Sequence, residues 1–499
     1  MYALYVPLIL CLLLAYLAWK YLNGCFKYWQ KLNVQYVKPV PFFGNSFQIF
    51  TSQVTIGELL GNLYKQFDAA FFGMYMLHKP VLVIRDPELI KKVLVKDFHH
   101  FHDRSVLYDE QCDAIASNML FFSKSPEWKL IRYKVTPLFT TGKLKNMMDL
   151  CKEVANDMVS YLRSYDTTNC IDAKELGGRY ATDAINSCTF GIKTNSFKSD
   201  KVSFYPMCKE ILEFDWKTGF SQVAYFIAHG LVKTFKLRFF DYQTSNLLRK
   251  VFWDTLNERE RTKIVRHDLI DAMIGFKNSP NLTESFQFEG DRILSIAVQV
   301  FTAGFETIGS TVSFALYELS IQRDIQEKLR SEINSTFLQY GSFDYLVIKH
   351  MRYLHMVVQE TLRKYPILPF LERKCAKTYS IPEKNLIIDA GTPIYIPLLG
   401  LHYDPKYFKN PDNFDPERFA DKKVDKTFYL PFGDGPRGCI GARFSLMAVK
   451  VALLYILREF EVKPSPSRTP TKIRFSPYSV FLSPSTGIYL KFKANRVVD

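Results

Sequence analysis

The chain lacks the cysteine patterns that a disulfide framework or a zinc site requires. Its nine cysteines are odd in number, scattered along 499 residues, and include no C-x-x-C pair. Such usage is typical of a protein whose body folds in a reducing compartment. Internal repeats, low-complexity tracts and long linkers are also missing. Their absence excludes repeat architectures and leaves the chain beyond residue 45 as one large unit.

Charge is missing from the start of the chain. Residues 2–19 are uncharged and mostly apolar, and no acidic residue precedes Glu58. A stretch of about eighteen such residues is just long enough to span a membrane as a helix. Four lysines follow it, namely Lys20, Lys27, Lys31 and Lys38. By the positive-inside rule, the N-terminus is then luminal and the body cytosolic.

A cleaved signal peptide is the alternative interpretation of this stretch. It fits poorly, because no Lys or Arg precedes the apolar run and no small-x-small site ends it. Pro39 and Pro41 then stiffen the connection that follows. We expect a transmembrane anchor over residues 1–20, a basic, proline-containing hinge over residues 21–45 and a single large domain over residues 46–499.

The net charge of +15 favours acidic partners and anionic lipid surfaces. Nucleic acid is the usual alternative for a basic chain, but neither a Lys/Arg stripe nor a nucleic-acid motif is present. Most long segments have helical periodicity, and strand-like runs occur at residues 80–84, 392–396 and 487–491. The sequence therefore predicts a mainly α fold with small β-sheets.

The segment from Phe432 to Gly441 is rich in glycine and contains one cysteine, which could bind a metal ion as a thiolate. It has the pattern F-x-x-G-x-R-x-C-x-G, with Gly435, Gly438 and Gly441 removing Cβ atoms where a flat ligand would approach. Backbone N–H groups can then face the Cys439 sulfur, while Arg437 supplies a cation for carboxylates of the ligand. The alternative is a buried structural thiol, which is the usual state of a lone free cysteine.

A second motif, Ala303-Gly-Phe-Glu-Thr307, lies inside a helix predicted over residues 291–320, with Asp291 as its N-cap. A glycine inside a helix costs about 1 kcal/mol relative to alanine, so Gly304 needs a reason. One reason is that Ala303 and Gly304 leave room for a ligand against the helix. Glu306 and Thr307 would then provide an acid and a hydroxyl that relay protons. A tolerated glycine beside surface polar residues is the alternative.

Charged residues in other segments complete the pattern. Glu360 and Arg363 share a helix face and can pair, with Arg418 of a later P-E-R-F segment available to join them. Alone, such a pair is read as a common surface ion pair of little consequence. Trp128 and Arg132 lie one helical turn apart. Arg373 follows the helix that carries Glu360; singly, each of these is read as a solvated charge or a buried ring.

Taken together, these motifs resemble those of the cytochromes P450, whose iron is held by a cysteine thiolate. The resemblance extends from the hinge to about residue 493 and includes Phe101-His-Asp-Arg104 and Leu401-His-Tyr-Asp-Pro405. It is greatest to the microsomal clan of drug-metabolising enzymes, and within it to insect members that oxidise plant toxins and insecticides. It implies haem b as the cofactor and Cys439 as the metal ligand.

The resemblance also implies roles for individual residues. Thr307, with Glu306, would steady dioxygen and guide protons, and Glu360, Arg363 and Arg418 would hold the cysteine loop without being catalytic. The remaining positions that the resemblance assigns to cofactor binding are Trp128, Arg132, Ala303, Gly304, Arg373, Phe432, Arg437 and Gly441. Ile308 departs from the Ser or Thr that often follows in the family, which leaves Thr307 as the expected local hydroxyl.

The function implied is insertion of one oxygen atom from O2 into lipophilic small molecules, by hydroxylation or epoxidation. Electrons would come from an NADPH–cytochrome P450 reductase, with cytochrome b5 as an additional partner, at the endoplasmic reticulum membrane. The alternatives are an endogenous hormone or lipid hydroxylase, a haem-thiolate isomerase or dehydratase, and a haem-binding scaffold without turnover. The sequence does not name the substrate.

Two further expectations concern the membrane. The segment from Trp216 to Phe240 mixes aromatic residues with lysines and is either a second membrane contact or a buried helix pair. The sequons at Asn281 and Asn334 should carry no glycan if the body is cytosolic. By the resemblance, substrate contacts should come from residues 106–122, 210–240, 301–307, 368–371 and 479–482.

Overall fold

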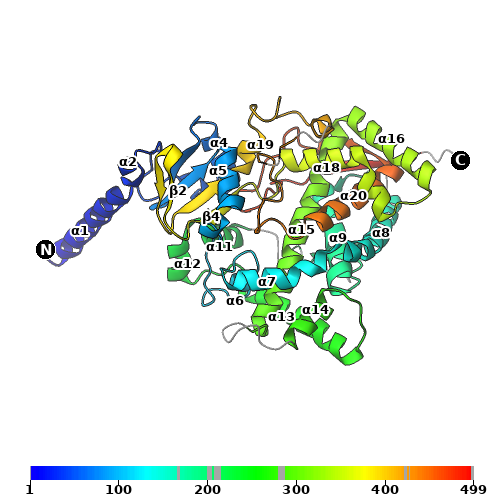
Figure 1. Cartoon of the computed structure of the whole chain (residues 1–499), viewed down its shortest axis with the longest axis horizontal. Coiled ribbons are helices and arrows are strands. Elements are labelled where there is room, and N and C mark those ends of the chain that lie inside the picture. The colour runs from blue at the N-terminus through cyan, green and yellow to red at the C-terminus, as the bar shows by residue number, and fades with distance from the viewer. Residues whose placement is uncertain are drawn as a thin grey trace.

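A computed structural model shows the chain as a mostly helical body with a lone N-terminal helix (Figure 1). It describes residues 2–165, 169–198, 205–206, 209, 215–278, 287–420, 424–425 and 427–495. The prediction of a mainly α fold with small sheets, in a single large domain, is confirmed. Asn281 and residues 210–214 of the predicted substrate segments lie outside the described residues.

The α-helices of the described residues are α1 (Tyr2–Cys25), α2 (Tyr28–Lys31), α3 (Phe47–Phe50), α4 (Ile56–Tyr64), α5 (Pro87–Lys91), α6 (Ala114–Asn118), α7 (Glu127–Val135), α8 (Thr141–Ser164), α9 (Ala173–Ile185), α11 (Trp216–Ile227), α12 (His229–Phe235), α13 (Tyr242–Thr262), α14 (Leu269–Lys277), α15 (Gly290–Ile321), α16 (Arg323–Tyr340), α17 (Tyr345–His350), α18 (Arg352–Lys364), α19 (Leu398–His402) and α20 (Ala442–Glu459). The strands are β1 (Phe71–Met76), β2 (Lys79–Ile84), β3 (Ile171–Asp172), β4 (Leu371–Lys374), β5 (Tyr379–Ile381), β6 (Leu386–Ile388), β7 (Pro393–Ile396), β8 (Phe460–Pro464) and β9 (Tyr489–Ala494).

Helix α1 projects away from the body (Figure 1), and its described apolar side chains, such as Ile9 and Leu13, are exposed. The segment after it is packed on the body. Trp29 is 1% exposed and donates from its indole Nε1 to the carbonyl oxygen of Met74 in β1 (3.0 Å). A Cβ atom on Gly73 would meet the Trp29 ring, so that glycine makes the docking possible.

The sheets are small and lie at the edges of the helical body. The largest has the strand order β1-β2-β7-β4, with β2 and β7 parallel and the other pairs antiparallel. A three-stranded sheet has the order β3-β9-β8, and β5 pairs with β6. The predicted strands at residues 80–84 and 392–396 are confirmed as β2 and β7. The third begins two residues later than predicted, as β9 at Tyr489.

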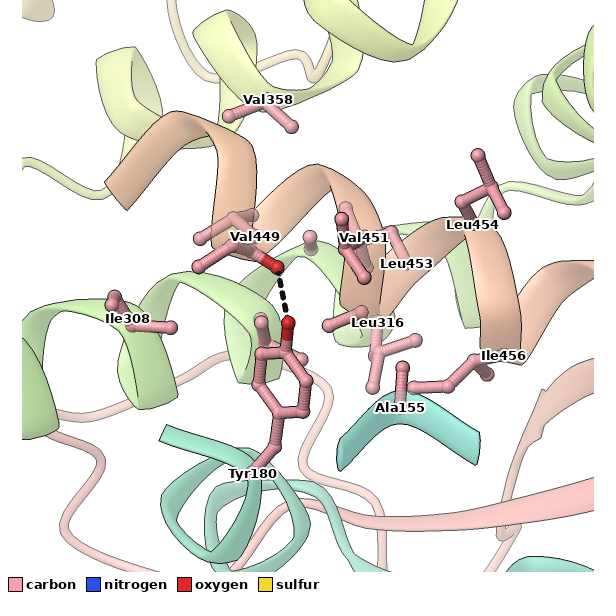
Figure 2. Packing of buried hydrophobic residues seen from close by; sticks show 14 of the residues in the cluster. Ala155, Tyr180, Ile308, Leu316, Val358, Val449, Val451, Leu453, Leu454 and Ile456 are labelled. Atoms are coloured by element: carbon pink, nitrogen blue, oxygen red, sulfur yellow. Dashed lines mark hydrogen bonds between the residues drawn. The ribbon is translucent and has the colours of Figure 1, made fainter. Parts of the chain in front are cut away.

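Helix α15 runs through the centre of the body and is packed by α9, α6, α20 and α18. By length and composition it could cross a membrane, but 72% of its apolar window is buried, so it is a core helix. Helices α9 and α15 approach closely because Gly177 faces Gly309. A Cβ on Gly177 would lie 2.5 Å from the Gly309 carbonyl oxygen. Nearby, Tyr180 of α9 donates to the Ala448 carbonyl oxygen of α20 (2.9 Å; Figure 2).

The predicted N-cap of this central helix was wrong. The helix begins at Gly290 with Glu289 in the N-cap position, which makes no side-chain cap hydrogen bond. Asp291 lies in the first turn and instead accepts two hydrogen bonds from the Arg249 guanidinium of α13 (2.9 and 2.7 Å). The Asp291 carboxylate thus forms an ion pair with Arg249 and does not cap the helix.

Candidate active site

The segment that carries Cys439 is a tight loop that leads directly into α20. The Cys439 N–H donates to the Phe432 carbonyl oxygen (2.8 Å), and the Gly438 N–H donates to that of Gly435 (2.9 Å). Gly435 has φ +71°, and a Cβ there would overlap the Leu94 carbonyl oxygen, so only glycine fits. Gly441 is different, because a Cβ would find only the Phe139 ring at 3.9 Å, so no protein contact demands its glycine.

The Cys439 thiol borders open space although protein surrounds it. Its side chain retains exposed surface, while burial raises the pKa of the thiol. Three features oppose that rise and favour the thiolate: the Gly441 backbone N–H, Arg132 and Arg104. In the described part of the chain, no group of three or more His, Cys, Asp or Glu side chains is placed to hold a metal ion.

Arg437, in the same loop, is anchored from several sides. Its Nε donates to the His102 carbonyl oxygen (2.8 Å), and Nη2 lies 3.1 Å from Asp103 Oδ1. The guanidinium lies over the Trp128 ring of α7, 4.1 Å from its centroid. Arg132, one turn further along α7, donates to the Gly438 carbonyl oxygen (2.8 Å). The structure therefore brings the predicted Trp128, Arg132 and Arg437 together around the loop.

Two more arginines, Arg373 and Arg104, lie near Arg437 and have buried nitrogen atoms without hydrogen-bond partners. Arg373 is 1% exposed and donates from Nη1 to the Glu372 carbonyl oxygen (2.8 Å), but its Nε has no hydrogen-bond partner. Arg104, for which the sequence predicts no role, has Nε and Nη1 without partners. Its guanidinium lies 4.0 Å from the centroid of the Phe121 ring.

The pKa shifts show that these arginines repel one another. Burial and the neighbouring Arg104 and Arg373 lower the pKa of Arg437 to about 8. Burial and Arg104 lower that of Arg373 to about 9. Buried guanidinium groups with free N–H donors and an excess of like charge fit the carboxylates of a bound anion. A flat dicarboxylate with a metal that takes a thiolate, as haem is, fits this donor set.

The central helix presents its predicted motif to the same space. Within a buried stretch of α15, Ala303, Gly304 and Thr307 retain partly accessible surface, so that face borders the cavity. The Thr307 hydroxyl donates to the Ala303 carbonyl oxygen (2.7 Å). The predicted reason for Gly304 needs correction: a Cβ there would lie 2.6 Å from Ile185 Cδ1, so the glycine first accommodates α9.

Glu306 points the other way and is 3% exposed. Its Oε1 accepts a hydrogen bond from the Ser310 hydroxyl (3.1 Å) and lies 3.6 Å from Lys174 Nζ. Lys174 keeps 35% of its side chain exposed and also donates to the Ser483 hydroxyl. The expectation that Thr307 is the single local hydroxyl was therefore wrong, because Ser310 lies one helical turn from Glu306 and contacts it.

The predicted structural ion pair is fully buried. Arg363 donates from Nε and Nη2 to both carboxylate oxygens of Glu360 (2.7 and 2.8 Å), and both side chains are 0% exposed. Arg418 Nε lies 3.4 Å from Glu360 Oε1, and the Asp415 N–H donates to the same oxygen (2.8 Å). The interpretation as a surface pair is excluded.

His402 of α19 joins this pair to the cysteine loop. Its Nδ1 lies 3.2 Å from the Arg363 carbonyl oxygen, and its Nε2 accepts from the Leu430 N–H (3.1 Å). Burial, with the Arg363 charge, lowers the pKa of His402 to about 3, so the ring is neutral and carries its proton on Nδ1. His402 lies within Leu401-His-Tyr-Asp-Pro405, and the sequence predicts no role for it because its partners are distant along the chain.

Aromatic rings pack together where α11 meets the loop before α7 and the loop before β4. The Phe226 ring centroid lies 6.1 Å from that of Phe121 and 5.9 Å from that of Phe370. Phe301 and Phe305 of α15 lie 6.3 Å apart. Phe121, Phe226 and Phe370 come from three of the predicted substrate segments and pack in one hydrophobic cluster, whereas Phe301 and Phe305 of a fourth belong to another.

The comparisons with known proteins agree with this geometry. The family model described as Cytochrome P450 matches residues 34–492. The chain is 43% identical to "Cytochrome P450 6k1" of Blattella germanica, over 95% of this chain and 94% of that protein. It is 36% identical to "Probable cytochrome P450 6g2" of Drosophila melanogaster, over 97% and 98% of the two chains. It is also 36% identical to "Cytochrome P450 6j1" of Blattella germanica, over 98% and 96%.

The fold and the cysteine site define a haem-thiolate oxidoreductase. The chain belongs to the cytochrome P450 family, whose members are monooxygenases with a haem-thiolate cofactor. The resemblance to insect members is confirmed, since these relatives are insect proteins.

Proposed function

We propose that this protein binds haem b through the Cys439 thiolate and inserts one oxygen atom from O2 into lipophilic small molecules. The observation that carries the proposal is the Cys439 thiol beside Arg104, which together with its neighbour Arg373 has buried guanidinium nitrogens that lack partners. Haem would provide a partner for each group: its iron would bind the Cys439 sulfur, and its carboxylates would accept hydrogen bonds from the guanidinium groups. When bound, it supplies the redox-active iron at which dioxygen is activated.

The residues of the cysteine loop would bind and tune this group. Phe432 and Gly441 flank Cys439, and the Gly441 N–H favours the thiolate. Arg132 holds the loop at the Gly438 carbonyl oxygen. Trp128 fixes Arg437 in its orientation, so that Arg437, Arg373 and the newly recognised Arg104 can share the carboxylates.

Two groups on α15 would handle protons. The Thr307 hydroxyl borders the cavity. Its Oγ1 would hold a proton for transfer to the bound O2. Glu306 would receive protons from solvent through Lys174, whose side chain reaches both the buried carboxylate and the surface. Ser310 would orient the carboxylate, and Ala303 and Gly304 would leave the helix face open.

The rings around the cavity favour lipophilic substrates, and among these we infer xenobiotics such as plant toxins or insecticides. An endogenous hormone or lipid hydroxylase would use the same machinery. Electrons would come from NADPH through cytochrome P450 reductase, with cytochrome b5 as an additional donor. A haem-thiolate isomerase or dehydratase, or a scaffold without turnover, would not consume NADPH in the presence of reductase. That assay separates them from a monooxygenase.

We also propose that residues 1–20 anchor the protein in the endoplasmic reticulum membrane, with residues 46–499 in the cytosol behind the hinge at 21–45. The exposed apolar side chains of α1 support an anchor. A second contact would come from exposed rings on α11 and α12, of which Trp216 is 64% and Phe235 67% exposed. Val223 and Val232 on the same helices are buried, so these helices contribute side chains to the core as well as to the surface. Removing residues 1–20 should weaken membrane binding without abolishing it, and full release would contradict the second contact.

The cysteine tests the proposal directly. The reduced carbon-monoxide complex of the full chain should show the red-shifted Soret band of thiolate-ligated haem. Cys439→Ser should lose this band, whereas Cys375→Ser, a buried thiol with carbonyl partners, should keep it. Survival of the band in Cys439→Ser would exclude Cys439 as the ligand.

A further inference from the structure

A second cavity lies between α13, α15 and the segment that ends α9. Its volume is about 40 Å³, and Leu294, Val298 and Phe301 of α15 form one of its walls. These three residues are spaced by four and three positions, so they share one face of the helix. Ala303 follows Leu294 by nine residues, about two and a half turns, and therefore lies on the opposite side of α15. We call this space the rear cavity, because α15 separates it from the space beside Cys439.

The walls of the rear cavity are apolar apart from one side chain. Leu247 and Val251 of α13 and the Phe190 ring contribute to the other walls. Among the described residues that line the cavity, Asn186 is the only one with a polar side chain. The cavity is only partly enclosed, so a small molecule can enter it without unfolding of these helices.

Asn186 offers this cavity an unused hydrogen-bond donor. The residue is 3% exposed, and its Nδ2 atom is buried without a hydrogen-bond partner. It begins the π-helical turn Asn186–Phe190, and such turns are rare and often occur at functional sites. Its carbonyl oxygen accepts from the Ile192 N–H (3.1 Å), so the main chain is paired where the side chain is not. A buried amide donor is unfavourable without an acceptor, which indicates an acceptor that the protein does not supply.

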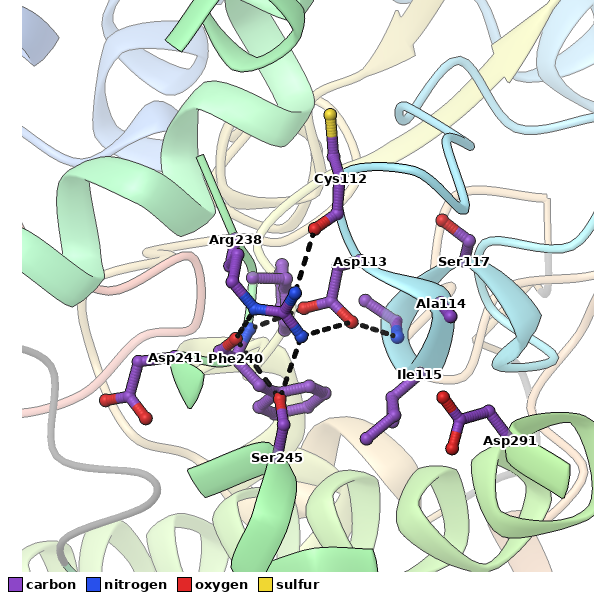
Figure 3. Close-up of polar contacts among 12 residues, drawn as sticks. Cys112, Asp113, Ala114, Ile115, Ser117, Arg238, Phe240, Asp241, Ser245 and Asp291 are labelled. Atoms are coloured by element: carbon purple, nitrogen blue, oxygen red, sulfur yellow. Dashed lines mark hydrogen bonds and ion pairs between the residues drawn. The ribbon is translucent and has the colours of Figure 1, made fainter. Parts of the chain in front are cut away.

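Buried polar groups near the starts of α13 and α15 are paired, in contrast to Asn186. Figure 3 shows Arg238 and Asp113 between α6 and α13. The Arg238 guanidinium donates to the Ser245 hydroxyl (3.2 Å), and Asp113 accepts from the Phe240 N–H (2.9 Å). The unpaired amide of Asn186 therefore departs from the pattern around it.

The size and the chemistry of the rear cavity define what fits it. Since roughly 10–15 Å³ holds one water-sized group, a volume of about 40 Å³ accommodates about three or four heavy atoms. Water fits poorly, because a buried water needs about two to four polar partners and Asn186 is the only polar side chain among the described lining residues. A molecule with one acceptor and an apolar remainder fits better, since the acceptor pairs with the amide and the remainder contacts leucine and phenylalanine.

We propose that the rear cavity binds a small neutral molecule of about four heavy atoms, apolar apart from one hydrogen-bond acceptor, as a short ketone is. The acceptor takes the free N–H of Asn186 Nδ2. The inference does not rest on the proposed function, because the rear cavity and Cys439 lie on opposite sides of α15. Phe301, which belongs to one of the predicted substrate segments, lines the rear cavity.

The test compares acetone with isobutene, which have the same number of heavy atoms and nearly the same shape but differ in the acceptor. The full-length, haem-loaded protein in phosphatidylcholine nanodiscs is saturated with clotrimazole, whose imidazole ligates haem iron, so that the space beside Cys439 is filled. Saturation-transfer NMR then measures the Kd of each probe, with empty nanodiscs as the blank. The wild type should bind acetone more tightly than isobutene.

Asn186→Leu keeps the size of the side chain and removes the donor. It should raise the Kd for acetone about fivefold, as the loss of one hydrogen bond predicts, without weakening isobutene. Val251→Phe, at a half-buried position of α13, places a ring in the cavity and should weaken both probes. Asn257→Leu makes the same exchange at an exposed position of α13 and should change neither Kd.

Equal effects of Asn186→Leu on the two probes would overturn the inference, because the amide would then make no contact with the acceptor. Acetone binding that survives Val251→Phe, or that clotrimazole abolishes, would place the probe elsewhere and overturn it as well. If neither probe binds the wild type, the rear cavity takes no such ligand. The wild-type preference and Val251→Phe still decide the matter if Asn186→Leu does not fold.

Discussion

Two buried groups of charges near the cysteine loop differ in how completely they are partnered. Around Glu360, each guanidinium nitrogen of Arg363 has an acceptor, and His402 uses both ring nitrogens. Around Arg373, by contrast, Arg373 Nε and Arg104 Nε and Nη1 have no acceptor, and burial with the like charge of Arg104 lowers the pKa of Arg373. The first arrangement is complete within the protein, so it stabilises the fold. The second is incomplete, which indicates a place for an anionic ligand.

The largest effect should follow from breaking the complete group. Arg363→Ala leaves the buried Glu360 carboxylate with only Arg418 as a charged neighbour, and this should cost about 3–5 kcal/mol of unfolding free energy. Thermal unfolding of the variant measures the loss. Lys328→Ala removes an exposed ion pair with Glu417 and should cost less than about 1 kcal/mol. Equal losses in the two variants would contradict the distinction.

The complete group should also make stability depend on pH. The pKa of His402 is lowered from 6.5 to about 3 by burial and by Arg363, so the unfolded chain binds the proton first as pH falls. The stabilisation is full above pH 6.5 and is lost progressively below it, by about 2 kcal/mol between pH 6.5 and 5. Unfolding at several pH values should show this slope. His402→Gln should reduce it, and an unchanged slope would show that His402 is not buried and neutral.

Removal of an arginine from the incomplete group should not lower stability, unlike removal of Arg363 from the complete group. Arg373→Gln removes a buried charge that lacks a full set of partners, so the unfolding free energy of the haem-free protein should not fall. Haem transfer to apomyoglobin should become about tenfold faster, because one contact to a carboxylate is lost. If the variant loses apoprotein stability and retains haem normally, Arg373 is structural.

The smallest effect concerns proton supply. Thr307→Ala should raise peroxide released per NADPH a few-fold while haem binding persists, because the hydroxyl that borders the cavity is removed. Thr311→Ala removes a hydroxyl that is bonded to the Thr307 carbonyl oxygen and should leave the ratio unchanged. Identical ratios in both variants would mean that protons arrive by another route.

Local sequence predicted the first group better than the second. The i, i+3 spacing of Glu360 and Arg363 is a local signal, and the structure pairs these two residues; the glycine turns of the frame around Cys439 are local signals too. The fold class, β2 and β7 also followed from local periodicity. The environments of Arg104, His402 and Lys124 depend on segments up to hundreds of residues away, so spacing carries no trace of them. For the same reason, the tertiary partners of Asp291 and Gly304 were missed.

An experimental structure of the haem-loaded protein tests the central claim most directly. We predict that Arg373 Nε and Arg104 Nε and Nη1 acquire carboxylate oxygens at about 3 Å, which is ordinary hydrogen-bond distance. The contacts of Glu360, Arg363 and His402 should stay as they are. Guanidinium nitrogens still without partners beside bound haem, or a haem iron without Cys439 as its ligand, would contradict the account.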